Sequence, residues 1–196
     1  MSDVVVLHAV LPEALDAARA EWLLARLPYA RRLELEQRDA AARTASLLAT
    51  ELVLAAVARL RGEPPDISRL RFPQQQKPYL EDGSCFSVSH SGRRVVVAAS
   101  DRCDVGIDVE DLGGPTGPAE LDRWTAIEAT LKATGCGLRQ ARDVRLACDL
   151  STGEVSGQLV HLRRIVIAPD CIARLATRQP VHAVAVAEWG GAVAGG

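Results

Sequence analysis

The sequence predicts an α+β fold, because short runs rich in β-branched residues alternate irregularly with two longer helical stretches. The runs at 4–10 and 105–110 have the composition of strands, whereas residues 30–60 carry apolar residues on one broad face of a helical period. The chain has 196 residues, 48% of them hydrophobic, which suffices for one large domain or two small ones.

The first part of the chain is predicted to contain one strand and two helices. The strand covers residues 4–10, and a helix then opens at Pro12 and continues to Leu27, where Pro28 ends it. Residues 30–60 are interpreted as one helix that is basic at its start. Its second half is apolar on almost every side, so it should be a central buried helix.

The middle of the chain is predicted to form a hairpin that leads into a third strand. Residues 70–72 are a brief strand candidate, and residues 86–90 and 95–99 pair around the Ser91-Gly92 turn. The strand at 105–110 follows directly after this hairpin.

The last part is predicted to contain a loop, a helix and further strands. The loop at 111–121 is rich in glycine and proline, and Asp122 caps a helix over 123–134 that Gly135 ends. The remaining expected segments are strands at 143–148, 158–164 and 181–189 and a flexible tail at 190–196.

Composition excludes several classes of function. The net charge of −2 and the aromatic content of 4% argue against a nucleic-acid-binding surface. The five cysteines include no C-x-x-C pair, which argues against a zinc site or a disulfide framework and favours the reducing cytoplasm. No signal peptide and no run of about 18 apolar residues is evident, so we expect no membrane association.

The strand at 105–110 carries the main candidate site. Val105, Ile107 and Val109 alternate with a second face that presents Asp108 and Glu110 side by side. Two neighbouring carboxylates repel one another unless a cation lies between them, and Mg²⁺ prefers such oxygen ligands. For this pattern alone, the better interpretation is the solvated face of an edge strand.

Other candidates are also weak when each is taken alone. Glu128 and Lys132 lie along one face of the predicted helix, which is typical of a plain surface ion pair. His90 lies between Ser89 and Ser91, but the absence of G-x-S-x-G argues against a hydrolase. Lys77 is interpreted either as a solvated loop lysine or as a phosphate contact.

Taken together and in order, these motifs resemble the Sfp-type 4′-phosphopantetheinyl transferases. The family patterns are approximately G-K-P, N-x-S-H-S, G-(I/V)-D-(I/V)-E and W-x-x-K-E-(A/S)-x-x-K. The matching segments are K-P at 77–78, S-V-S-H-S at 87–91, G-I-D-V-E at 106–110 and W-T-A-I-E-A-T-L-K at 124–132. Each motif is weak by itself, but four in the family order are specific.

The resemblance implies a role for each matched residue. Asp108, Glu110 and Glu128 would hold Mg²⁺, with Mn²⁺ as an alternative ion. Glu128, or water on the metal, would take the proton from a carrier serine, and Lys132 would neutralise the departing adenosine 3′,5′-bisphosphate. The groups that would contact coenzyme A, the co-substrate, are Arg31, Arg43, Lys77, Ser89 and His90.

The resemblance also implies an architecture and a reaction. We expect two pseudo-symmetric halves, residues 1–103 and 104–189, each a small antiparallel sheet packed with helix, with the active site in the cleft between them. The expected protein is a monomeric enzyme that moves 4′-phosphopantetheine from coenzyme A to a serine of an acyl, peptidyl or aryl carrier protein.

Four departures from the family pattern keep an alternative open. Ile127 replaces the motif lysine, Gln76 the glycine, Ser87 the asparagine, and the 111–123 segment is short. The alternative is a degenerate relative that binds coenzyme A or a carrier domain without efficient turnover.

Overall fold

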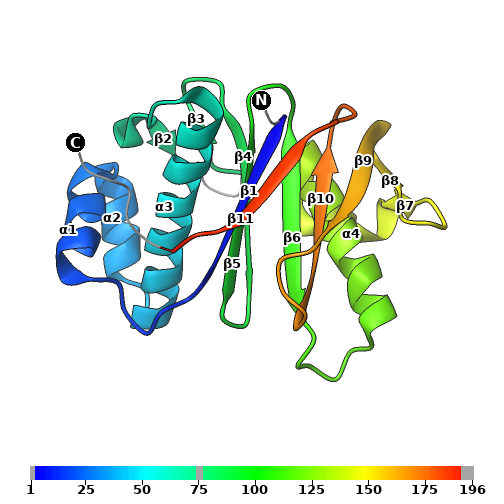
Figure 1. Cartoon of the computed structure of the whole chain (residues 1–196), viewed down its shortest axis with the longest axis horizontal. Helices are drawn as coiled ribbons and strands as arrows, with labels where there is room; N and C mark the ends of the chain where they lie inside the picture. The colour runs from blue at the N-terminus through cyan, green and yellow to red at the C-terminus, as the bar shows by residue number, and fades with distance from the viewer. Residues whose placement is uncertain (1–2, 74–76, 191–196) are drawn as a thin grey trace.

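The computed structural model describes residues 3–73 and 77–190 and has a mixed α+β fold (Figure 1). Small, mostly antiparallel sheets pack against helices in four layers, with helices outside and two sheets inside. The helices and strands, in order, are β1 (Val4–Val10), α1 (Ala17–Arg26), α2 (Tyr29–Glu36), α3 (Ala40–Arg61), η1 (Ile67–Arg69), β2 (Leu70–Arg71), β3 (Tyr79–Leu80), β4 (Cys85–Ser91), β5 (Arg94–Ser100), β6 (Val105–Asp111), α4 (Pro118–Thr134), η2 (Leu138–Asp143), β7 (Arg145–Leu146), β8 (Thr152–Val155), β9 (Gln158–Ile165), β10 (Cys171–Thr177) and β11 (Val184–Glu188).

The first sheet has the strand order β11-β1-β5-β4. β1 pairs antiparallel with β5 and parallel with β11, so the C-terminal strand returns to the N-terminal strand. β4 and β5 form the predicted hairpin, and Gly92 at its turn has φ 52°, a conformation that favours glycine.

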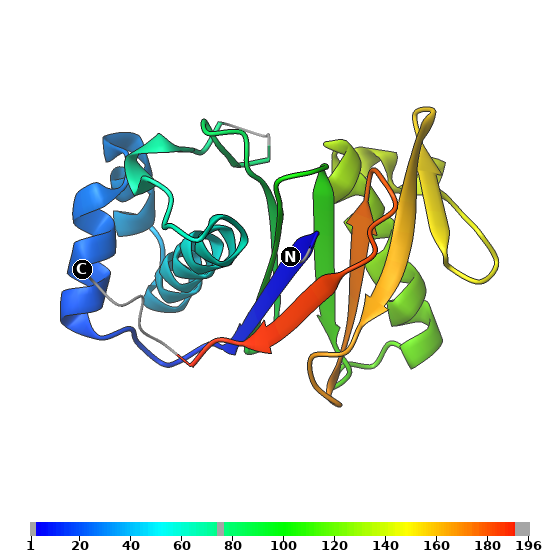
Figure 2. The same ribbon diagram turned by 45° about the horizontal axis from the view of Figure 1, so that its top comes forward.

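α3 covers the outer face of this sheet, and α1 and α2 pack against α3 on the side away from the sheet (Figure 2). The helix predicted over residues 30–60 is two helices, because Asp39 caps a new start by accepting a hydrogen bond from the Ala42 amide at 2.8 Å. Similarly, the first helix begins at Ala17 rather than Pro12, where Asp16 caps the Arg19 amide at 3.1 Å.

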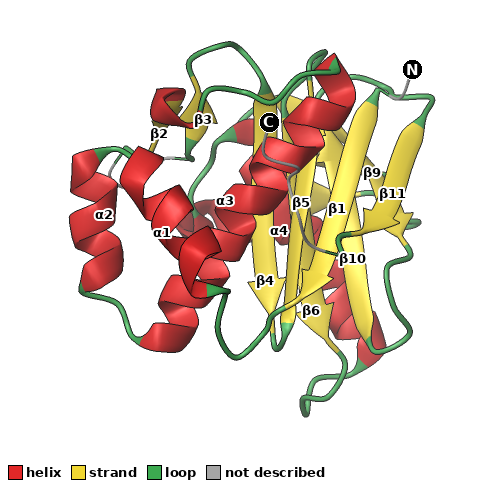
Figure 3. Ribbon diagram, turned by 60° about the vertical axis from the view of Figure 1, so that its left-hand side comes forward, coloured by secondary structure: helices red, strands yellow, loops and turns green. Residues whose placement is uncertain are grey.

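α3 crosses the sheet and is the core helix of this layer (Figure 3). Within the described residues it is the one helix long and apolar enough to span a membrane by length and composition, so the expectation that no such stretch exists was too strict. However, 67% of its apolar window is buried inside the protein, as in a core helix.

The second sheet has the order β6-β10-β9-β8-β7, and α4 covers its outer face. Its strand β10, which the sequence analysis did not predict, pairs with both β6 and β9. Every residue of β10 is buried, so it lacks the alternation by which half-buried strands are recognised. β8 was also missed.

α4 begins earlier than predicted, at Pro118, with Gly117 as its N-cap. Proline suits the first helical turn because it needs no amide donor there. Asp122 is therefore not a cap. Its carboxylate instead accepts hydrogen bonds from the Arg174 guanidinium at 2.6 and 2.9 Å, which ties α4 to β10.

The two sheets bury their facing surfaces against each other. Val4, Val6 and Val96 from the first sheet form one cluster with Val105 and Ile107 from β6. Each of these five side chains is fully buried. As a result, the apolar face predicted for the strand at 105–110 lies between the sheets, and its other face turns toward α4.

Candidate functional site

The face of β6 that meets α4 carries Gly106, Asp108 and Glu110. At Gly106 a Cβ atom would lie 2.1 Å from the Ala129 carbonyl oxygen and 2.5 Å from the Ala133 amide nitrogen, both in the backbone of α4. Only glycine permits this approach. The helix therefore rests on the strand, and Glu128 and Lys132, which directly precede Ala129 and Ala133 in α4, lie beside the strand carboxylates.

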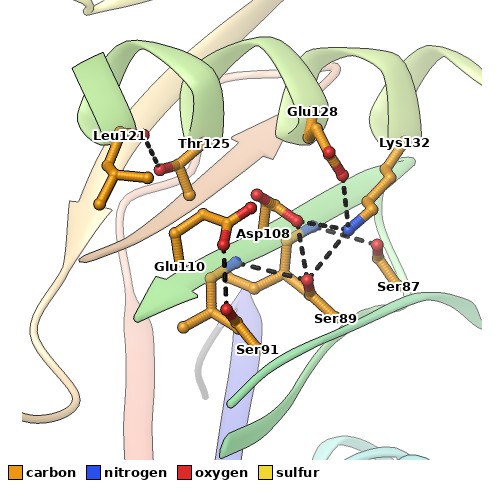
Figure 4. Close-up of polar contacts among 11 residues, drawn as sticks. Ser87, Ser89, Ser91, Asp108, Glu110, Leu121, Thr125, Glu128 and Lys132 are labelled. Carbon is orange, nitrogen blue, oxygen red and sulfur yellow. Dashed lines mark hydrogen bonds and ion pairs between the residues drawn. The ribbon is translucent and has the colours of Figure 1, made fainter. Parts of the chain in front are cut away.

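Three carboxylates meet in this contact (Figure 4). Asp108, Glu110 and Glu128 each offer an oxygen, and these atoms all lie within 4.8 Å of one another. Asp108 is 2% exposed, and its Oδ2 atom is buried with no hydrogen-bond partner. A buried, unpaired carboxylate oxygen is costly, so the donor set fits a hard divalent cation such as Mg²⁺.

Lys132 is the cation that the structure places in this cluster. Its Nζ atom lies 2.5 Å from Asp108 Oδ1 and 3.6 Å from Glu128 Oε2. It also donates to the Ser89 hydroxyl at 3.1 Å, and that hydroxyl donates to Asp108 Oδ1 at 2.7 Å. One oxygen of Asp108 is thus fully used, while Oδ2 is left over.

The pKa of Asp108 is raised, because its carboxyl is buried with only one of the two oxygens hydrogen-bonded. Burial raises the pKa of its carboxyl from 3.8 to about 6, and the nearby Glu128 charge acts in the same direction. The Lys132 ammonium and the Ser89 hydroxyl lower the pKa, but not enough to offset burial. Ionised Asp108 is therefore an unfavourable group that further positive charge would stabilise.

The serines of β4 have a role that sequence reasoning missed. Ser87, Ser89 and Ser91 share the face turned toward β6. Their hydroxyls accept hydrogen bonds from the amides of β6, at 3.1 Å for Ile107, 3.4 Å for Val109 and 3.1 Å for Asp111. The period-two spacing of serine next to an unpaired strand edge is the signal that could have predicted this serine ladder.

Ser91 also donates to Glu110 Oε2 at 2.9 Å, so two members of the ladder hold carboxylates of the cluster. Ser87 stands where the family pattern has asparagine, and here its hydroxyl fixes the β6 backbone instead. The ladder joins the edges of the two sheets at the point where the site lies.

A pocket of about 440 Å³ opens on the other face of β4. His90 lines it, because adjacent residues of a strand point to opposite faces, so His90 and Ser89 serve different places. Arg31 and Arg38 from the α2 region line it as well. Glu34 of α2 lines it too, and its remaining lining residues are mostly apolar and come from α3, β4, β5 and the stretches on either side of the undescribed residues 74–76.

Arg31 contacts an aromatic ring and a carboxylate at the edge of this pocket. Its guanidinium stacks over Phe72 at 4.4 Å and pairs with Glu34 at 2.6 Å. Its Nε atom is buried with no hydrogen-bond partner. Arg38 also pairs with Glu34, at 2.6 Å, and its presence in the pocket was not predicted.

Arg43 and Lys77, two of the residues expected to contact coenzyme A, do not line this pocket. Arg43 is exposed at the start of α3 and is not among the residues that line the pocket. Lys77 is half-buried and donates to the Val105 carbonyl at 2.5 Å, and desolvation lowers the pKa of its ammonium. Lys77 therefore lies at the beginning of β6, near the cluster rather than in the pocket.

The structure describes the surroundings of two departures from the family pattern, Ile127 and the short segment before α4. Ile127 is half-buried and packs against a cluster that contains Leu131 and Val144, a packing role that lysine would not fill. Before α4, the segment between Asp111 and Pro118 contains no helix or strand. Gln76 lies outside the described residues, as does most of the predicted tail.

The comparisons with known proteins leave the function to be argued from this geometry. No protein-family model matches the chain, and no curated protein sequence matches it.

Proposed function

We propose that this chain is a 4′-phosphopantetheinyl transferase that uses coenzyme A, Mg²⁺ and a carrier protein. The observation that carries the proposal is the carboxylate cluster with its buried, unpaired Asp108 oxygen, which lies beside Lys132 at the joint between the two sheets. Such a site suits phosphoryl-type transfer, which depends on charge neutralisation and positioning more than on covalent help.

Coenzyme A suits the two separate places that could receive anionic groups. The pocket with Arg31, Arg38 and His90 would take the nucleotide end, where arginine forks bind phosphate groups well. The cluster of Asp108, Glu110 and Glu128 would hold Mg²⁺, which would neutralise charge on the pyrophosphate. A long ligand is needed, because β4 separates the two places.

The protein groups have distinct tasks in the transfer. Glu128 is partly exposed and would accept the proton of the carrier serine as its oxygen attacks the pantetheine-bearing phosphorus. The bond from that phosphorus to adenosine 3′,5′-bisphosphate breaks, and Lys132 would face the charge that develops on the leaving phosphate. Ser89 orients both Asp108 and Lys132.

The proposed organisation has two related halves. The sheet β11-β1-β5-β4 with α3 would be one, and the sheet that begins at β6 with α4 would be the other. The boundary near residue 103 leaves β11 as a strand of the second half that joins the first sheet. We further propose that the protein is a cytoplasmic monomer that has a carrier protein as its partner and binds neither nucleic acid nor membrane.

The test is to incubate the protein with apo-carrier, coenzyme A and Mg²⁺ and to measure the mass of the carrier. A gain of one phosphopantetheine, absent in Asp108→Ala and in the presence of a chelator, is the expected result. If the carriers keep their mass and coenzyme A does not bind, the proposal is wrong.

The alternative is a relative that binds coenzyme A or a carrier without turnover. The half-buried Ile127 favours it, because the family places a cation next to the metal-binding glutamate. Calorimetry distinguishes the two, since the alternative predicts Mg²⁺-dependent binding of coenzyme A but no change in carrier mass.

A further inference from the structure

Lysine is rare in this chain, and both lysines lie along β6. Of the 23 lysine and arginine residues, only Lys77 and Lys132 are lysines. Lys77 donates to the backbone carbonyl of Val105, whereas Lys132 lies among the carboxylates of Asp108 and Glu128 (Figure 4). A chain that otherwise uses arginine thus has lysine at the position that touches the metal-binding cluster.

The ammonium of Lys132 and a metal ion would share one carboxylate. Lys132 Nζ is 2.5 Å from Asp108 Oδ1. A metal would use the unpaired Oδ2 of the same group, and Mg²⁺ requires carboxylate oxygens at about 2.0–2.1 Å in a nearly octahedral arrangement. Two cations that share one carboxylate repel each other, and in a partly buried site this repulsion is weakly screened. A metal that uses Asp108 therefore weakens or breaks the Lys132 contact.

Lys132 carries an ammonium that is accessible enough to solvent to separate from Asp108. Its side chain is 28% exposed, so its ammonium can be rehydrated without unfolding α4. A lysine ammonium is a strongly hydrated point charge on a flexible stem, whereas an arginine fork would hold the carboxylate at two points. Once released, this ammonium would be free to pair with an anionic group bound at the metal site.

We propose that Lys132 is the resident counterion of the metal site: it neutralises Asp108 without metal, yields to the metal, and then binds the phosphate group that arrives with it. This inference rests on the metal site of the proposed function. The consequence is that metal binding and polyphosphate binding are coupled. Metal alone binds weakly because it must displace Lys132. A polyphosphate strengthens metal binding because it gives the displaced ammonium a partner, and metal strengthens polyphosphate binding by the same factor.

The first experiment compares Mn²⁺ affinity, with and without inorganic pyrophosphate, in wild type, Lys132→Met and Arg123→Met. The control Arg123→Met removes the same charge from an exposed position of the same helix. We expect Lys132→Met to bind Mn²⁺ alone about 5- to 150-fold more tightly than wild type, the usual range of a coupling free energy. Pyrophosphate should strengthen Mn²⁺ binding less in Lys132→Met than in the other two proteins.

A second variant preserves the charge in case Lys132→Met fails to fold. Lys132→Arg should bind Mn²⁺ alone less tightly than wild type, because the fork holds Asp108 more firmly. Tighter binding in Lys132→Arg, or unchanged binding in a folded Lys132→Met, would overturn the inference.

The lysine signals provide a direct readout. In a protein labelled at lysine Cε, NMR should show two side-chain signals, and the Lys132→Met spectrum identifies the one from Lys132. Saturating Mg²⁺ should move the Lys132 signal toward that of a free lysine and leave the Lys77 signal in place. A Lys132 signal that does not change at metal saturation contradicts the displacement.

The outcomes separate this inference from the proposed function. If wild type and Lys132→Met bind metal equally and Asp108→Ala does not bind it, the counterion role is wrong and the metal site stands. If no protein binds metal, with or without pyrophosphate, both are wrong.

Discussion

Asp108 is the residue at which stability and the proposed chemistry conflict most directly. Its pKa of about 6 lies above the ordinary value of 3.8 although Lys132 is in contact, so burial outweighs the ion pair. Ionised Asp108 thus destabilises the metal-free fold, as is common for groups in functional sites.

We expect Asp108→Asn to stabilise the metal-free protein at pH 8 by on the order of 1–3 kcal/mol while abolishing metal binding. Lys132 keeps Glu128 as a partner at 3.6 Å, so the substitution leaves no isolated charge. Denaturant unfolding of both proteins measures the difference. Asp143→Asn, which changes an exposed carboxylate, controls for net charge. A less stable Asp108→Asn protein would show that the ion pair dominates.

His8 determines a second response to pH. Its ring is buried in β1, its Nδ1 atom has no hydrogen-bond partner, and burial is the main cause that lowers its pKa from 6.5. The folded protein therefore favours neutral His8. Its contribution to stability is complete above pH 6.5 and is lost as the pH falls through the lower folded-state pKa.

Urea unfolding between pH 5 and pH 8 should accordingly show a loss of stability on the acid side that is smaller in His8→Leu. The exposed His182 provides the control, since His182→Gln should leave the acid-side loss as it is in wild type. Equal pH profiles for His8→Leu and wild type would mean that other groups cause the loss.

At the scale of elements, the contact between α4 and β6 positions the candidate site. Gly106→Ala would force α4 away from the strand, because the new methyl group would overlap the backbone at Ala129 and Ala133. We expect a loss of stability of about 1–3 kcal/mol, typical of overpacking, together with weaker Mn²⁺ binding as Glu128 moves. Gly114→Ala is the control, as a Cβ there meets no atom within 4 Å. Wild-type metal affinity in Gly106→Ala would show that the cluster does not depend on this contact.

The serine ladder, in which hydroxyls of β4 accept hydrogen bonds from amides of β6, also holds two elements together. Ser87→Ala removes the acceptor for the buried Ile107 amide and should cost about 1–3 kcal/mol of unfolding free energy. Amide hydrogen exchange should show faster exchange at Ile107. Ser91→Ala should cost less, because Ser91 is only partly buried and water can replace its hydroxyl. The reverse order of the two effects would argue against the ladder as a structural seam.

These elements also show what sequence reasoning can reach. β1 and the β4–β5 hairpin were predicted nearly to the residue, because runs of valine mark β1 and β5 and alternation marks β4. β10 was missed because its sequence, C-I-A-R-L-A-T, shows neither alternation nor a run of β-branched residues, and the break between α2 and α3 depends on one capping contact at Asp39. Local composition carries little information on either point.

The candidate site was predictable in part, where it follows from the period of a single strand or from the order of motifs. The face shared by Asp108 and Glu110 follows from the strand period, and motif order suggested that Glu128 would join them. Arg38 could not be assigned to the pocket, nor could Lys132 be placed against Asp108, because both depend on how separate elements pack.

At the scale of the whole molecule, the two sheets depend on each other. The inner face of the first sheet, with Val4, Val6 and Val96, is covered by the second sheet. The N-terminal strand is also held by the last part of the chain, because Asp3 accepts hydrogen bonds from the amides of His182 and Ala183 and β1 pairs with β11.

A fragment of residues 1–103 should therefore not fold alone, since it would expose this apolar face and leave β1 as an open strand edge. Circular dichroism and hydrogen exchange should show a disordered or aggregated fragment that gains protection when residues 104–196 are added. The matched control is a chain that ends at Gly190, which keeps every described strand and should unfold in a single transition like the full protein. Cooperative unfolding of 1–103 by itself would mean instead that α3 and its sheet form an independent core, so that the joint holding Asp108 and Lys132 would be an interface between two preformed units.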